Sequence, residues 1–360
     1  MGRERKDDFK TNPIQNPRPR RLSSSAPSNK QEAKIRADRS KKTPQKVSYS
    51  FLKILTGSDL SRRRLPFMSV ESVNKGPVVW LTGCMHGDEV TGIVTVQEIF
   101  KKIQRQHLLR GSLYAFPLMN PIGFETASRY VTLSKEDLNR SFPGSVNGSL
   151  AERMADKILT TIIHTRPDLV LDLHNDWMKS IPYTLVDAAL RDSHRGACEK
   201  AIAVAKKSGF LVVLETDDME RSFCYSLLER DVPALTIELG ESYIVNEKNV
   251  EYGVRSILGI LAYLDMIEAP EEPFSFPVPS GVMNRLLKFS SHPVSSASGI
   301  IRFLAKPGDV LKKGHAVARI YNAFGKLQDT ILCSADGIVL GHSDSSVAFP
   351  GAPLMAFGVI

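Results

Sequence analysis

Cysteine and long apolar runs are scarce in this chain of 360 residues. No apolar run approaches the roughly 20 residues that a membrane-spanning helix needs, and the first residues lack the apolar segment of a secretory signal. The cysteines have neither the spacing of a disulfide framework nor that of a metal site: Cys84, Cys198, Cys224 and Cys333. We therefore expect reduced thiols, a cytoplasmic location and no membrane partner.

The excess of positive charge, formally +8, is confined to the first part of the chain. Residues 1–46 hold 14 Lys or Arg against 5 Asp or Glu, whereas the remainder holds 33 against 34. This Pro/Ser/Lys-rich leader has almost no apolar periodicity, so we expect it to be disordered. Glu4, Asp7 and Asp8 argue against a mitochondrial presequence. Without interleaved aromatic residues we interpret the leader as a solvating extension rather than a nucleic-acid or membrane contact.

Apolar strand-like runs alternate with helical patterns after a short β-like segment at 47–76. This alternation predicts an α/β fold with helices on both faces of the sheet, and the 42% hydrophobic content suffices for two folded domains. Strands are expected at 78–82, 112–117, 169–174, 183–186, 211–215 and 234–239, and helices at 89–106, 150–165, 188–208, 221–230 and 248–267.

Two histidines and a glutamate next to buried-strand patterns form a candidate metal site. His86 and Glu89 follow the apolar run 78–81, and His174 ends the run 168–174. Side chains at the carboxyl ends of such strands point into one crevice, where open α/β sheets bind ligands. Two His and one Glu leave zinc a fourth position for water, which is typical of catalytic zinc and predicts hydrolysis. Alone, the His86/Glu89 pair is weak, because a loop histidine is often only solvated.

The turn-rich segment 120–144 carries three donor side chains, Arg129, Asn139 and Arg140. Loops between scaffold elements often carry binding residues, and guanidinium groups suit carboxylate recognition. Two surface arginines and a turn-capping asparagine remain the alternative. Glu238 ends the β-rich run 234–239, so it faces the same crevice or caps the next element.

Five motifs in order resemble the succinylglutamate desuccinylase/aspartoacylase family, part of the wider zinc carboxypeptidase (M14-type) group. The resemblance covers about residues 48–269 and implies a zinc-carboxypeptidase-like mixed sheet. The motifs are HGDE at 86–89, NPIG at 120–123 with Arg129 six residues later, DLNRSFPG at 137–144, DLH at 172–174 and IELG at 237–240.

The resemblance implies a role for each candidate residue. His86, Glu89 and His174 match the ligands of one Zn²⁺ per chain, and Glu238 matches the glutamate that activates water and returns its proton to the amine. Arg129 matches the arginine that steadies the oxyanion, and Asn139 and Arg140 match the pair that binds the substrate carboxylate. Asp172 could support His174 by a hydrogen bond or be only a polar strand residue.

The expected activity is hydrolysis of the amide bond of a small N-acyl amino acid. A metallocarboxypeptidase acting on peptides or peptidoglycan fragments is one alternative, and a non-catalytic zinc-binding module is another. An acidic acyl group would need a second cationic contact, for which Arg221 and Arg230 are candidates, and Tyr243 could also reach the site.

A Pro/Glu-rich linker at 270–279 precedes a β-rich segment at 280–360. This segment resembles the biotinyl/lipoyl-like β-barrel appended to many family members, without the lysine hairpin that carries a prosthetic group. We expect a small all-β, barrel-like domain acting as a lid or an assembly module. A homo-oligomer is an open alternative.

Overall fold

The computed structural model describes residues 45–56, 60 and 62–360. The leader expected over 1–46 therefore lies outside the described residues, apart from Gln45 and Lys46. Gln45 is tied to the body of the protein, because its backbone N–H donates to the Gln104 carbonyl at 3.0 Å. None of the described helices is both long and apolar enough to cross a membrane.

A mixed sheet of thirteen described strands organises the protein, in the order β1-β2-β4-β3-β5-β9-β7-β8-β10-β17-β15-β12, with β6 paired to β15. The neighbours β4, β3, β5 and β9 run parallel, whereas β7 is antiparallel to β9. The strands of the first 270 residues are β1 Ser48–Thr56, β2 Arg62–Glu71, β3 Val78–Gly83, β4 Ser112–Phe116, β5 Leu169–His174, β6 Lys179–Ser180, β7 Tyr183–Asp187, β8 Val212–Glu215 and β9 Ala234–Glu238.

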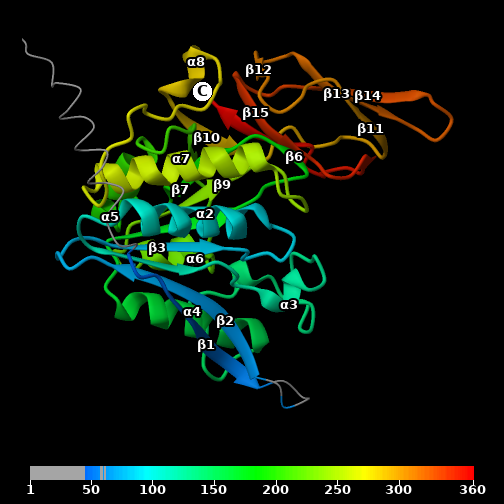
Figure 1. The fold of residues 1–360 in the computed structure, drawn as a ribbon. Helices are drawn as coiled ribbons and strands as arrows, with labels where there is room; N and C mark the ends of the chain where they lie inside the picture. Colours follow the sequence, from blue (N-terminus) through cyan, green and yellow to red (C-terminus); the bar gives the residue numbers. More distant parts are fainter. Residues whose placement is uncertain (1–44, 57–59, 61) are drawn as a thin grey trace, which may run out of the picture. The chain divides into compact units, whose positions relative to one another are not determined.

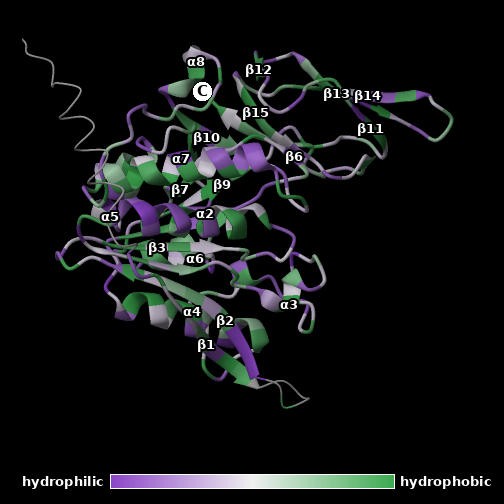
Figure 2. Ribbon diagram, in the orientation of Figure 1, coloured by the Kyte–Doolittle hydropathy of each residue, from purple (hydrophilic) through white to green (hydrophobic). Residues whose placement is uncertain are grey.

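Helices cover both faces of this sheet, as predicted. The helices α2 (Thr91–Gln106), α5 (Arg195–Ala205) and α7 (Glu247–Tyr263) share one apolar core, and α4 (Leu150–His164) and α6 (Phe223–Leu228) share the other. Figure 1 shows α2 and α7 on one side of β3 and α4 on the other. In Figure 2, α2, α4 and α7 carry both hydrophobic and hydrophilic residues, as expected for helices with one buried face.

Alternation along the central strands assigns their residues to the two cores. In β5, Leu169, Leu171 and Leu173 belong to the α2/α7 core, whereas Val170 belongs to the α4/α6 core. Successive side chains of a strand point to opposite faces, so Asp172 and His174 share the face of Val170. The same parity places Glu238 of β9 on that face, which positions the candidate site.

The C-terminal segment is β-rich as expected, and its strands divide between two sheets. The strands β10 (Leu286–Ser290), β12 (Val310–Leu311), β15 (Gly337–His342) and β17 (Met355–Val359) extend the main sheet, where β10 runs parallel to β8. A second sheet has the order β14-β13-β11-β16, with bounds Leu327–Leu332, Ala316–Tyr321, Gly299–Phe303 and Val347–Ala348. Figure 1 shows β11, β13 and β14 gathered together. The described residues fall in one compact unit, and separate catalytic and appended domains stay a prediction.

Expected and observed elements agree closely in the first part of the chain, with one displaced helix start. The helix expected from residue 188 begins at Arg195, because the Ala188 N–H donates to the Glu215 carbonyl at 2.7 Å and continues the β7–β8 ladder. The segment 120–144 is mostly turns, with short helices α3 (Pro121–Phe124) and η1 (Leu138–Arg140). A last short helix, α8 (Ser280–Met283), precedes β10.

Candidate metal centre

Strand register brings the candidate residues together. In the parallel ladders, Thr82 is the partner of Asp172, and His174 is the partner of Glu238. His86 and Glu89 lie on the loop that follows β3. This loop packs tightly on α3, since a Cβ added to Gly87 would lie 1.9 Å from the Gly123 carbonyl carbon.

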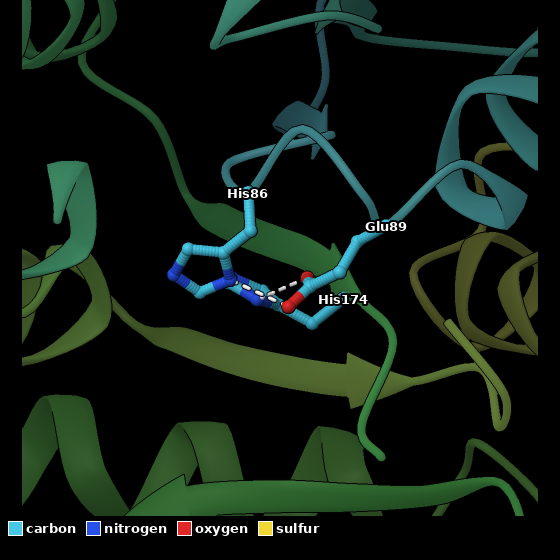
Figure 3. A group of neighbouring side chains, drawn as sticks. All are labelled: His86, Glu89 and His174. Atoms are coloured by element: carbon cyan, nitrogen blue, oxygen red, sulfur yellow. Dashed lines mark hydrogen bonds and ion pairs between the residues drawn. The ribbon is translucent and has the colours of Figure 1, made fainter. Parts of the chain in front are cut away.

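His86, Glu89 and His174 converge as the metal-ligand prediction requires. One potential ligand atom from each residue lies within 4.8 Å of the others. His86 Nδ1 lies 2.5 Å from Glu89 Oε1, and His174 Nδ1 lies 2.8 Å from Glu89 Oε2 (Figure 3). The three residues are 2%, 4% and 4% exposed, respectively. Among the described residues, this is the single group of three or more such side chains close enough to share an ion.

The second nitrogen of each imidazole is held by an aspartate. His174 Nε2 lies 2.7 Å from Asp172 Oδ2, and Thr82 donates to the other Asp172 oxygen at 2.6 Å. The structure therefore places Asp172 in the supporting position that the sequence left undecided. His86 Nε2 lies 3.2 Å from Asp137 Oδ1. Such contacts orient the Nδ1 atoms toward a shared ion.

Electrostatics favour an ionised carboxylate between the imidazoles. Burial penalises the charged form of Glu89, but His86 and His174 outweigh it and lower the pKa of Glu89. Burial also opposes protonation of His174, yet Asp172 and Glu89 raise its pKa above the usual value. A carboxylate and two nitrogens that converge, each imidazole anchored at its far side, suit a zinc ion.

Asp137 was not singled out from the sequence, although it connects two candidate residues. Its Oδ2 lies 3.0 Å from Arg129 Nη2, and its Oδ1 accepts from the Asn139 N–H at 2.8 Å. Burial opposes its charge, but His86 and Arg129 outweigh this and lower the pKa of Asp137. The sequence feature that could have identified Asp137 is its position in the DLNR motif, two residues before Asn139.

Arg129, Asn139 and Arg140 are positioned at the mouth of the same site. Arg129 Nη1 lies 3.9 Å from Glu89 Oε1. Asn139 Oδ1 accepts from the Phe223 N–H at 2.8 Å, and Arg140 Nη1 donates to the Asn139 carbonyl at 2.8 Å. Each donor group is thus anchored by the surrounding backbone or by Asp137.

Glu238 carries an uncompensated buried oxygen. Its Oε2 is buried without a hydrogen-bond partner. Burial raises the pKa of Glu238 well above the usual value, and Asp176 and Glu89 add to this while His174 opposes it. Such a carboxyl group is suited to exchanging a proton.

All seven predicted site residues line one cavity of about 390 Å³. Three other candidates do not line it. Arg221 is paired with Glu152 at 2.8 Å, Arg230 donates to the Ser226 carbonyl, and Tyr243 is 51% exposed. Cys84 is buried, with its Sγ 3.3 Å from the His86 carbonyl, and burial raises the pKa of its thiol. It is therefore a packing residue.

The cavity also contains residues that the sequence did not indicate. Asp187, Glu215 and Asp217 line it, and Phe289 of β10 adds an aromatic wall from the C-terminal segment. Asp187 and Glu215 end neighbouring strands, so only strand register reveals that they are adjacent.

The fold and site define an α/β protein with a buried His–Glu–His group suited to one metal ion. A profile of the succinylglutamate desuccinylase/aspartoacylase catalytic domain matches residues 75–264, more than half of the chain. The chain belongs to this family, as the motifs predicted.

Named relatives support this assignment. The N-alpha-acetyl-L-2,4-diaminobutyric acid deacetylase of Halomonas elongata is 26% identical over 287 residues, covering 77% of this chain and 80% of that enzyme. A succinylglutamate desuccinylase of a Shewanella species is 25% identical over 190 residues, 49% of this chain and 54% of that enzyme.

Solved structures share the fold. The product-bound ectoine utilization protein EutE (DoeB) from Ruegeria pomeroyi matches with a TM-score of 0.73 and 20% identity, over 89% of this chain and all of that one. A succinylglutamate desuccinylase/aspartoacylase from Rhodobacter sphaeroides matches with a TM-score of 0.72 and 20% identity, over 88% of this chain and 95% of that one.

Proposed function

We propose that this protein is a zinc-dependent deacylase that hydrolyses the amide bond of a small N-acyl amino acid. The observation that supports it best is the presence, in one cavity, of three metal-ligand candidates, a carboxyl group with a buried and unpaired oxygen, and three anchored donors. The Halomonas relative is named for such a substrate, N-alpha-acetyl-L-2,4-diaminobutyric acid. The four cysteines, all free and buried, agree with the proposed cytoplasmic location.

His86, Glu89 and His174 would hold the zinc ion, with Asp137 and Asp172 fixing the two imidazoles. Bound there, zinc would supply Lewis-acid chemistry, which polarises a carbonyl and lowers the pKa of water. Glu238 is the proton carrier in this proposal. Its carboxylate takes a proton from the attacking water and passes it to the departing amine nitrogen.

The cationic and amide side chains would bind and orient the substrate. Arg129, held by Asp137 at 3.0 Å, stabilises the negative charge that develops on the carbonyl oxygen. Groups in such positions contribute about 3 kcal/mol to transition-state stability. Asn139 and Arg140 bind the free carboxylate of the amino acid, for which the planar guanidinium is suited.

The decisive experiment separates the proton carrier from the metal ligands. The Glu238→Gln variant retains about one zinc ion per chain, whereas turnover of N-acetyl amino acids falls about 1,000-fold, as expected for loss of a general base. His174→Ala loses zinc and turnover together, because two remaining ligands hold the ion poorly. Zinc is measured by elemental analysis and turnover by release of free amine.

The exposed Glu229 provides the control, since Glu229→Gln makes the same chemical change outside the cavity. This variant keeps both zinc and turnover. Unchanged turnover in Glu238→Gln would remove the catalytic role of Glu238 and favour a non-catalytic zinc-binding module. Hydrolysis of short peptides in preference to N-acetyl amino acids would favour a metallocarboxypeptidase.

A further inference from the structure

Two acidic side chains in the cavity have no part in the chemistry described above. Asp187 ends β7 and Glu215 ends β8, and the two are direct partners in the parallel ladder. They are 8% and 5% exposed, and both line the cavity. Two neighbouring acidic groups with little solvent around them repel each other when both are ionised. A purely structural reason for this pair would require a compensating partner.

Asp187 has no such partner. Among the described residues, no hydrogen bond or ion pair reaches its carboxylate, although more than nine-tenths of the residue is buried. Glu215 has only local backbone contacts, with the Asp217 N–H at 2.9 Å and with the Thr216 backbone. Burial and the neighbouring Glu215 raise the pKa of Asp187 to about 7, and Arg140 opposes the shift. A buried acidic group kept open toward a cavity points to a ligand of opposite charge.

Arg140 relates the two acids to the place where the substrate carboxylate would bind. It lines the same cavity, and its charge acts on both Asp187 and Glu215. No ion pair joins it to either acid within the described residues, so its guanidinium is open to a substrate carboxylate. Once that carboxylate is bound, the positive charge of Arg140 is neutralised and the two acids remain without a counter-charge.

We propose that Asp187 and Glu215 bind a cationic group, an ammonium or guanidinium, on the side chain of the substrate amino acid. This inference rests on the proposed deacylase function and narrows its substrate class to N-acyl derivatives of basic amino acids. It also explains why Arg221 and Arg230 lie outside the cavity. Among the described residues, Arg140 is the one cation whose charge acts on Asp187, and in this proposal the substrate carboxylate already occupies it, so an acidic side chain is disfavoured there.

Strand geometry indicates that the cation lies away from the scissile bond. Tyr183 is the register partner of Glu238, and Asp187 follows four residues later on β7. At about 3.4 Å per residue, the Cα atoms of Tyr183 and Asp187 are about 14 Å apart. The acidic side chains span part of this distance, so a flexible amino-acid side chain with a terminal cation spans the rest.

A substrate panel tests the proposal on the zinc-loaded full chain. N-α-acetyl derivatives of 2,4-diaminobutyrate, ornithine and lysine are compared with N-acetylglutamine and N-acetylnorleucine as neutral substrates and with N-acetylaspartate as an acidic one. The best basic substrate is expected to exceed the neutral ones in kcat/KM by about 100-fold, because the neutral ones leave buried acids unpaired. In Asp187→Asn and Asp187→Asn/Glu215→Gln this ratio falls to within about threefold of one.

Asp192→Asn is the matched control, because this exposed aspartate follows β7 and does not line the cavity. It retains the wild-type ratio. Elemental analysis accompanies the kinetics, with one zinc ion per chain expected in each protein. A second ion that is lost in Asp187→Asn would overturn the proposal in favour of a metal site. A wild-type preference for neutral or acidic substrates also overturns it, whether or not the variants fold.

Calorimetry keeps the test independent of turnover. Free 2,4-diaminobutyrate or ornithine should bind the zinc-loaded protein at least tenfold more tightly than norvaline. If no N-acyl amino acid is hydrolysed but this binding preference is found, the proposed function fails and the acidic subsite stands. If neutral N-acyl amino acids are hydrolysed best and norvaline binds as tightly as the diamino acids, the deacylase stands and the acidic subsite fails.

Discussion

At the scale of single residues, the site depends on contacts behind the metal-ligand candidates. Asp172 is the clearest case, because it lies 2.7 Å from His174 Nε2 and accepts from Thr82 at 2.6 Å. Both contacts are buried. They fix the ring of His174 so that its Nδ1 faces Glu89.

We predict that Asp172→Asn lowers zinc affinity by about 10- to 100-fold, as is typical when the partner of a ligand histidine loses its charge. The fold should persist, because asparagine is nearly isosteric and still accepts a hydrogen bond. Competition with a chromogenic chelator measures the affinity, and circular dichroism checks the fold. An affinity equal to that of wild type would mean that Asp172 is only a polar strand residue.

Residues within short motifs could be predicted from the sequence, and residues joined only by tertiary structure could not. His86, Glu89 and Glu238 lie within two residues of a glycine near the ends of apolar runs, so local pattern identified them. Asp187 and Glu215 also end apolar runs, but no pattern states that β7 and β8 are neighbours in register. Their importance depends on that pairing and on the cavity beside it.

At the scale of secondary-structure elements, hydrophobic runs located the central strands within about one residue of their observed ends. Fully buried strands such as β5 read as continuous apolar runs. The start of α5 was less predictable, because it depends on a hydrogen bond from Ala188 to the neighbouring strand. Long-range pairing therefore decided where this helix begins.

The loop after β3 is the element on which the proposed metal binding depends most. It carries both His86 and Glu89, and Gly87 lies between them against α3. The Gly87 N–H donates to the Ser128 carbonyl at 2.9 Å, so the contact between this loop and the segment after α3 is made by backbone atoms. No flexible side chain is available to move aside for a larger residue.

Gly87→Ala should therefore destabilise the protein by about 3 kcal/mol, the upper part of the usual range for overpacking. It should also weaken zinc binding, because the loop must shift with both of its ligand candidates. Denaturant unfolding and zinc titration are the measurements. Gly196→Ala is the matched control, since no atom lies within 4 Å of the added Cβ and alanine favours helix α5. Equal stability of the two variants would show that the loop is not held by this contact.

At the scale of the whole described molecule, four C-terminal strands extend the main sheet: β10, β12, β15 and β17. The strand β10 pairs with β8 on one side and with β17 on the other. Leu287 is fully buried and shares a core with Tyr183 and Val213. The Ile181 N–H donates to the Leu340 carbonyl at 2.8 Å, close to the candidate site. The sequence showed the β content of this segment but not the partners of its strands, which depend on contacts distant in the chain.

This arrangement predicts that the segment does not behave as an independent appendage. A chain ending at residue 279 would leave the edge of β8 unpaired and would expose the core around Tyr183, so it should aggregate rather than fold.

The single substitution Leu287→Ala tests the same contact without removing the segment, and it should lower the free energy of unfolding by about 3 kcal/mol. Leu327→Ala on β14, where the side chain is 52% exposed, should change it by less than about 0.5 kcal/mol. The free energies of unfolding of both variants are measured by denaturant unfolding of the full chain. A soluble, zinc-binding fragment 45–279, or a Leu287→Ala variant as stable as Leu327→Ala, would instead mean that the catalytic sheet is complete without β10.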